Sequence, residues 1–284
     1  MQVIGQLLKS QNFKALQDCV SIRAYAAVCW GGHTTSGSDY PDTWSVLLRD
    51  RLRKGDPRLP ATCHNKIPPF SPGRFATGVT AVDYLLLVCG GHNYGGPYLS
   101  SCFSLNTNEY SPEWSTMASM PINRGYYEFT TYGDAAFAIG GHNGGDLTQV
   151  DRWTTSNGWE TMASYPVPIH RHCAVSDPGY DRIYSMAGNS RSNAYYYTIS
   201  TNRWSSMPSL YWSGNNMACV IIRRRATGNK IIVLVGDGIL RQQYFDLTVY
   251  ESNGSGTWMT MADPQYTSFF SAIVSLTPYE SYEV

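Results

Sequence analysis

Short apolar stretches that end in glycine recur along the chain and indicate a protein built from β-strands. Three of them end in a glycine pair, at residues 27–32, 87–91 and 137–141, and two weaker copies occupy 184–188 and 233–236. Continuous apolar runs of this length are typical of strands that are buried on both faces. Their first glycines are separated by 59, 50, 48 and 48 residues, so we expect one strand-rich unit to repeat along the chain.

A tryptophan follows each of the later copies, and a proline follows each tryptophan. The pairs are Trp114 with Pro121, Trp159 with Pro166, Trp204 with Pro208, and Trp258 with Pro264. The first three tryptophans are spaced 45 residues apart, and the fourth follows after 54. An indole offers a large apolar body and one N–H that needs an acceptor. We therefore expect these side chains to pack between neighbouring units as part of the scaffold.

The complete unit resembles the kelch repeat, in which strands ending in Gly-Gly are followed by a tryptophan and a Met-Pro turn. The resemblance runs from about residue 20 to residue 284 and is strongest over 84–166. It implies an all-β, kelch-type β-propeller, with four-stranded blades around a central channel. The fourth and fifth copies have Gly188-Asn189 and Gly236-Asp237 in place of the glycine pair. Asn and Asp tolerate left-handed backbone angles better than most residues, so the turn can survive.

We expect a single domain over residues 1–284 with six blades, the repeats occupying 20–284. Residues 267–284 begin a last blade that the chain does not finish, and residues 1–19 could supply its missing strands. Closure between the terminal strands would leave no open sheet edge. The alternative is that the chain is a fragment of a longer gene product.

Composition agrees with a sheet protein and narrows the partners. The chain has 21 Tyr, 8 Trp and 9 Phe beside 26 Gly and 15 Pro, and only 15% charged residues. Loose helical spacing occurs only at 2–17 and 44–54. Lys plus Arg equals Asp plus Glu, at 21 each, which argues against nucleic acid or an anionic membrane as the partner. The apolar runs are too short to span a bilayer.

Seven cysteines favour a reducing compartment. The number is odd and no Cys-x-x-Cys pair occurs, so neither a zinc knuckle nor a full disulfide framework is indicated. Free cysteine packs well as a small apolar residue. We therefore expect a cytoplasmic protein. The alternative is an extracellular one with a cross-strand bond between Cys89 and Cys102.

The resemblance implies that a partner binds one face, formed by the loops after Gly-Gly and after the Met-Pro turn. Arginine and aromatic residues are enriched at binding hot spots, and an arginine-rich face suits an acidic or phosphorylated peptide. The candidate partner-binding residues on these loops are Arg124, Arg171, Arg191, Arg241, Tyr94, Tyr211 and Trp212. The competing interpretation is that Arg124 and Arg171 only hold the turns that follow the prolines.

We expect no metal and no cofactor. His33, His92 and His142 each follow a glycine pair and should hold equivalent places on three blades. Equivalent atoms on stacked sheets lie about 10 Å apart, whereas zinc needs each nitrogen at about 2.0–2.1 Å.

The sequence also contains no Gly-x-Ser-x-Gly elbow, phosphate loop or His-Glu-x-x-His segment. We therefore expect a protein-interaction module, such as an adaptor or a substrate receptor, and not an enzyme. The alternative is an oxidase-like, sugar-processing or glycan-binding propeller with a pocket at the central channel. A cluster of titratable residues with shifted pKa values would favour that alternative.

Overall fold

The computed structural model describes residues 68–260 except 69, 71–72, 94–95, 108, 110, 225, 237–240 and the side chain of Arg241, together with the backbone of three earlier strands. Those strands are β1 (Asp18–Ile22), β2 (Tyr25–Trp30) and β3 (Thr43–Val46), which form an antiparallel sheet in the order β1-β2-β3. The window at 44–54 was expected to be helical, but its first three residues lie in β3, so that expectation is wrong there.

Four further sheets have four antiparallel strands each, in chain order. The first consists of β4 (Phe75–Val82), β5 (Leu85–His92), β6 (Cys102–Asn106) and β7 (Trp114–Met117). The second consists of β8 (Glu128–Tyr132), β9 (Ala135–Ile139), β10 (Val150–Thr154) and β11 (Gly158–Thr161). The third consists of β12 (Cys173–Asp177), β13 (Arg182–Met186), β14 (Ala194–Thr198) and β15 (Arg203–Ser206). The fourth consists of β16 (Ala218–Arg223), β17 (Lys230–Gly236), β18 (Arg241–Asp246) and β19 (Trp258–Thr260).

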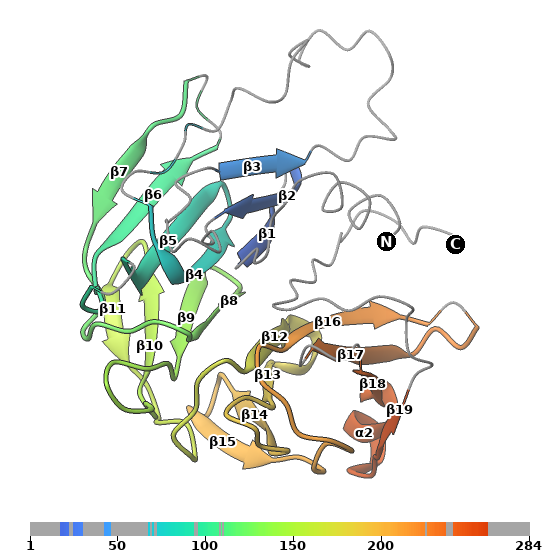
Figure 1. The fold of residues 1–284 in the computed structure, drawn as a ribbon. Coiled ribbons are helices and arrows are strands. Elements are labelled where there is room, and N and C mark those ends of the chain that lie inside the picture. The colour runs from blue at the N-terminus through green and yellow to red at the C-terminus, as the bar shows by residue number, and fades with distance from the viewer. Residues whose placement is uncertain are drawn as a thin grey trace, which may run out of the picture.

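The sheets stand around a common centre like the blades of a propeller (Figure 1). The first strand of each sheet lies against the first strand of the next, in the order β1, β4, β8, β12 and β16. The last strands, β7, β11, β15 and β19, lie on the outer rim. The described part of the chain thus holds four complete blades and a three-stranded sheet, where six blades were predicted. The predicted last blade at 267–284 and most of the closing segment at 1–19 lie outside the described residues.

The tryptophans join each blade to the segment before it, as the repeat predicted. Each lies on or at the start of an outer strand and donates its indole N–H to a main-chain carbonyl 41 to 50 residues earlier. The four bonds are Trp114 to Pro68 and Trp159 to Ala118 at 2.9 Å, Trp204 to Ala163 at 2.9 Å, and Trp258 to Pro208 at 3.0 Å. Every described tryptophan of the repeat therefore has its N–H satisfied while its rings pack against the blades.

The glycine pair has a fixed hydrogen-bond pattern, which corrects the alignment of the fourth copy. The N–H of Gly91 donates to Arg124 O, that of Gly141 to Ile169 O and that of Gly188 to Gly214 O. The equivalent of Gly90 and Gly140 is therefore Ala187, which has a left-handed φ of 62°. The pair is Ala187-Gly188, and the sequence-based assignment to Gly188-Asn189 is wrong by one residue. A Cβ at Gly188 would lie 2.6 Å from His170 O, so glycine is required there.

The last described blade departs from the repeat at one connection. A short helix, α2 (Leu247–Asn253), follows β18; Asp246 caps its N-terminus and Gly254 ends it with a left-handed φ of 73°. This helix accounts for the longer spacing between Trp204 and Trp258. A single 3₁₀ turn, η2 (Pro178–Tyr180), joins β12 to β13. Within the described residues, no helix combines the length and apolar character that a membrane crossing requires.

Among the described residues, two pairs of cysteines form disulfides. Cys89 on β5 is bonded to its cross-strand partner Cys102 on β6, which is the bond given above as the less favoured alternative. Cys173 on β12 is bonded to Cys219 on β16, with their Cα atoms 5.9 Å apart. The second bond joins the inner strands of two neighbouring blades, a link that the sequence did not predict.

Candidate functional site

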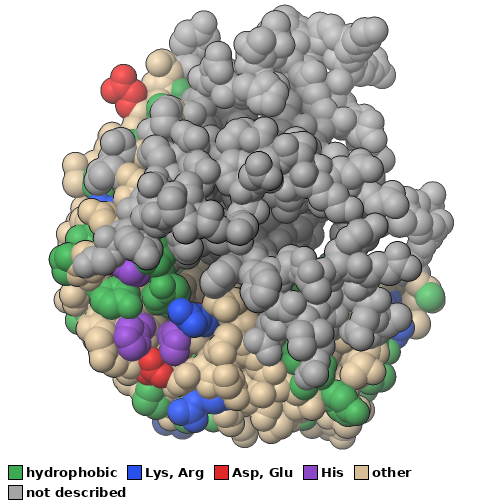
Figure 2. All heavy atoms as spheres, in the orientation of Figure 1, with side chains coloured by type: hydrophobic (Ala, Val, Ile, Leu, Met, Phe, Trp, Pro, Cys, Tyr) green, Lys and Arg blue, Asp and Glu red, His purple; other side chains and the backbone are tan. Residues whose placement is uncertain are grey.

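The described loops that follow the glycine pairs and the proline turns gather at one end of the blades. We call this end the loop face; it comprises the described residues of 93–101, 118–127, 140–149, 162–172, 187–193 and 207–217. Backbone hydrogen bonds tie its loops together, for example His142 N to Gly125 O at 2.8 Å and Asn189 N to His170 O at 3.1 Å. Figure 2 shows histidine, basic, acidic and apolar side chains grouped on the visible surface.

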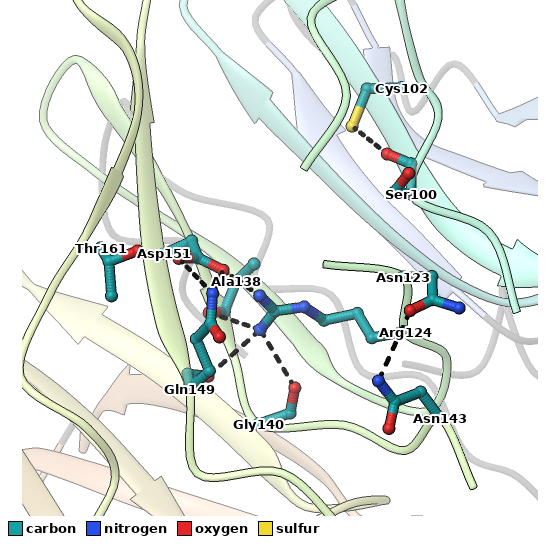
Figure 3. Close-up of polar contacts among 10 residues, drawn as sticks. All are labelled: Ser100, Cys102, Asn123, Arg124, Ala138, Gly140, Asn143, Gln149, Asp151 and Thr161. Carbon is teal, nitrogen blue, oxygen red and sulfur yellow. Dashed lines mark hydrogen bonds and ion pairs between the residues drawn. The ribbon is translucent and has the colours of Figure 1, made fainter. Parts of the chain in front are cut away.

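Arg124 lies beneath this face and is fully buried. Its Nη1 lies 3.2 Å from Gly140 O, 3.1 Å from Gln149 O and 3.4 Å from Ala138 O, and its Nη2 donates to Asp151, which is also fully buried (Figure 3). Burial lowers the pKa of Arg124, and Asp151 opposes that shift. Arg124 therefore has no exposed surface to offer a partner, and its guanidinium binds residues of the second and third strands of its blade and their connection.

Arg171 has a different place in the repeat. Ala76, Tyr126, Arg171 and Asn216 are equivalent residues at the inner strands, and all four have left-handed φ values between 51° and 55°. Tyr126 N donates to Ala76 O, and Arg171 N donates to Tyr126 O at 2.8 Å. This chain of bonds sets the Arg171 guanidinium over the Tyr126 ring, 4.6 Å from its centroid, where it remains partly exposed. A cation over an aromatic face is a favourable contact.

Arg191, Tyr211 and Trp212 lie together at the third and fourth complete blades. Arg191 forms an isolated bridge with Gly214, so the loop after β13 lies beside the loop before β16. The buried side chain of Gln243 accepts from Tyr211 N at 3.0 Å and lies 3.4 Å from Trp212 O. Trp212 packs partly on the core, whereas Tyr211 is 72% exposed. Tyr94 and the side chain of Arg241, the remaining candidates, lie outside the described residues.

A cluster of two histidines and one aspartate forms the most distinctive chemistry of the loop face. His142 and Asp146 belong to the loop after β9, and His170 precedes β12. Nδ1 of His142 and Nδ1 of His170 both lie 2.9 Å from the same oxygen, Asp146 Oδ1. Burial lowers the pKa of His170, with Arg171 and His142 adding to the shift and Asp146 opposing it. Asn189 donates to the second oxygen of Asp146.

His172 lies below this cluster as a neutral imidazole. Burial lowers its pKa to about 3, and His170 contributes to the shift. Neither ring nitrogen has a hydrogen-bond partner among the described residues. The left-handed turn at Arg171 separates the two histidines, so that His170 reaches the surface while His172 enters the core.

Sequence reasoning included His142 but missed Asp146 and His170. Only the histidines that follow a glycine pair were compared between blades, whereas His170 lies in the segment before β12. A usable signal was present: the loop after a glycine pair meets the segment that leads into the next inner strand, as the bridge between Leu147 and Ile169 shows. Polar residues in two such segments should therefore have been compared across blades.

Comparison with known families agrees with the repeat read from the sequence. The family model described as the Kelch motif matches residues 73–121, which span β4 to β7 and the turn after them. A search of curated proteins finds none that matches the chain. The matched segment is thus a kelch motif, and the three four-stranded sheets that follow it repeat its strand order.

Proposed function

We propose that the chain is a protein-interaction module that binds its partner on the loop face, around Tyr211, Trp212, Arg191 and Arg171. The observation that carries this proposal is Tyr211, whose side chain is 72% exposed although its backbone is held by the buried Gln243. A rigid exposed aromatic residue offers contact area at a low cost in conformational entropy. The neighbouring arginines suit an acidic or phosphorylated segment of that partner, in an adaptor or substrate receptor.

The full architecture belongs to the same proposal. A ring of six blades, closed between the terminal strands, would hold these loops in fixed positions. The two disulfides support the extracellular alternative over the cytoplasm, because such bonds persist in oxidising compartments and are rare in the cytosol.

The proposal is tested by affinity capture and mass spectrometry with matched variants. The variant Arg171→Ala/Tyr211→Ala removes one arginine and one aromatic side chain from the loop face. The control, Tyr84→Ala/Arg203→Ala, removes the same residue types from the turn between β4 and β5 and from the outer strand β15. We expect the control to retain the wild-type partner and the loop-face variant to lose it, with both variants folded by circular dichroism.

Direct titration of the recovered partner then gives the size of the effect. Loss of a hot-spot side chain costs about 2 kcal/mol or more, which is a weakening of about 30-fold. Equal binding by both variants would contradict the proposal.

An enzyme or glycan-binding propeller remains the second candidate, and one observation favours it. His142, Asp146 and His170 form a titratable cluster on the loop face, and the pKa of His170 is lowered. Such clusters are enriched at catalytic sites. Glycan-array binding or oxidase activity that is lost in His170→Gln and retained in the loop-face variant would favour this candidate.

A further inference from the structure

The cluster of His142, Asp146 and His170 supports an inference that does not depend on the proposed function. Its three potential ligand atoms, His142 Nδ1, Asp146 Oδ1 and His170 Nδ1, all lie within 4.8 Å of one another. Ligand atoms held about 2.1 Å from one tetrahedral ion are separated by about 3.4 Å. The two distances to Asp146 Oδ1 are 2.9 Å, so small side-chain rotations are enough to place all three around one ion.

The nitrogen of His170 provides the second observation. Nδ1 is buried and lies 2.9 Å from Asp146 Oδ1. Asp146 Oδ1 thus faces an imidazole nitrogen from each of the two histidines. A cation between the three atoms would satisfy both the lone pair of His170 and the charge of Asp146.

Backbone contacts of the surrounding loops fix the positions of the three residues. A pair of backbone bonds joins His142 to Gly125, and an isolated bridge joins it to Asp146. On the other side, the bridge between Leu147 and Ile169 fixes the residue that precedes His170. Asn189 donates to Asp146 Oδ2, which is the kind of outer contact that orients a ligating carboxylate.

From this geometry we propose that His142, Asp146 and His170 bind one divalent transition-metal ion of the zinc class. Imidazole with one carboxylate suits zinc and its neighbours better than calcium or magnesium, which prefer oxygen ligands alone. Three protein ligands leave at least one coordination position open, as in zinc sites that also hold water or a ligand. The side chains of His142, Asp146 and His170 are 31%, 21% and 18% exposed, so the ion can reach the site from solvent.

The ion joins two blades, since His142 and Asp146 follow β9 whereas His170 leads into β12. The proposal differs from the expectation of no metal site, which was reached by comparing His33, His92 and His142 alone. His33 lies outside the described residues, and the ring of His92 packs between Phe75 and Tyr98.

The test is titration of chelator-stripped full-length protein with ZnCl₂ by calorimetry, and with CoCl₂ by absorbance. We expect one ion per chain in the wild type, and at least tenfold weaker binding in His170→Gln and in Asp146→Asn. His92→Gln is the matched control, because His92 holds the place of His142 in the preceding blade, and it should bind like the wild type. A cobalt spectrum without a thiolate charge-transfer band distinguishes this site from cysteine ligation.

Thermal unfolding without metal verifies that each variant is folded, and zinc should raise the melting temperature of the wild type but not of Asp146→Asn. If a ligand variant does not fold, Asn189→Ala replaces it, with an expected loss of affinity of about tenfold through the outer contact. Absence of stoichiometric zinc binding in the wild type, or equal binding by the ligand variants, would overturn the proposal.

Discussion

The first two complete blades bury an arginine at the same position and stabilise its charge in different ways. Arg74 and Arg124 are equivalent, and each directs Nη1 to the first glycine carbonyl of its blade and to the carbonyl before the third strand. In the blade of β8 to β11 the guanidinium meets the carboxylate of Asp151. In the blade of β4 to β7 the equivalent residue is Phe103, and Arg74 lies 5.0 Å from the centroid of its ring.

The next two blades have no arginine at this position. Ile169 and Gly214 hold its place, and Tyr195 and Gln243 hold the place of Asp151. Gln243, which is fully buried, bonds instead to the backbone of the loop that carries Tyr211 and Trp212. One position under the loop face is thus filled by an ion pair, a cation–π contact, a tyrosine or an amide. The backbone pairing at this position is the same in all four blades, whereas the side chain differs from blade to blade.

The largest effect is expected when the ion pair is broken. Asp151→Ala leaves the Arg124 charge buried without its counter-ion and also removes the acceptor for Gln149 and Thr161. Removing one partner of a buried pair costs about 3–5 kcal/mol. We expect the free energy of unfolding, measured with urea, to fall by that amount, while Asp134→Ala on the exposed turn of the same blade changes it by less than about 0.5 kcal/mol.

The double variant Arg124→Met/Asp151→Leu sharpens this expectation. It removes both charges and should cost less than Asp151→Ala alone, because no unpaired charge remains. A cost equal to the sum of the two single substitutions would contradict the description of Arg124 and Asp151 as a coupled pair.

A smaller effect is expected at the equivalent arginine. Arg74→Met removes the hydrogen bonds to Gly90 O and Ser101 O, both at 3.2 Å, but leaves no buried carboxylate behind. Loss of buried hydrogen bonds of this kind costs about 1–3 kcal/mol. Urea unfolding should therefore place Arg74→Met between the wild type and Asp151→Ala. A larger loss than for Asp151→Ala would show that the aromatic setting binds the cation more tightly than the carboxylate does.

The sequence predicted the parts of this structure that depend on local pattern. The strands before each glycine pair and the tryptophans were identified from their spacing, because an apolar run and a turn residue are signals within a few positions. Arg124 and Arg171 were treated alike, since each follows a proline turn. The two arginines occupy different positions relative to the inner strand that follows them. Arg124 lies four residues before Glu128, the first residue of β8, whereas Arg171 lies two residues before Cys173, the first residue of β12. Only the register of these strands shows the difference.

Long-range pairing explains the remaining failures. Arg124 and Asp151 are separated by 27 residues, and nothing in either local sequence marks the other as its partner. Asp146 and His170 are likewise 24 positions apart and belong to segments that meet only when two blades pack together. The disulfide between Cys173 and Cys219, with a separation of 46, needs the same information.

The smallest effect is expected when the aromatic ring beside Arg74 is removed. Phe103→Leu keeps an apolar side chain near Arg74 but removes the ring over which the guanidinium lies, and it also removes the edge contact with Phe70. A cation–π contact of this kind contributes about 0.5–1 kcal/mol. In urea unfolding, the substitution should cost about 1 kcal/mol in the wild type and less in an Arg74→Met background, where no cation remains. If Phe103→Leu lowers the free energy of unfolding equally in both backgrounds, Phe103 contributes by packing alone. Arg74 would then be stabilised by the carbonyls of Gly90 and Ser101, and the ring would not play the part that Asp151 plays for Arg124.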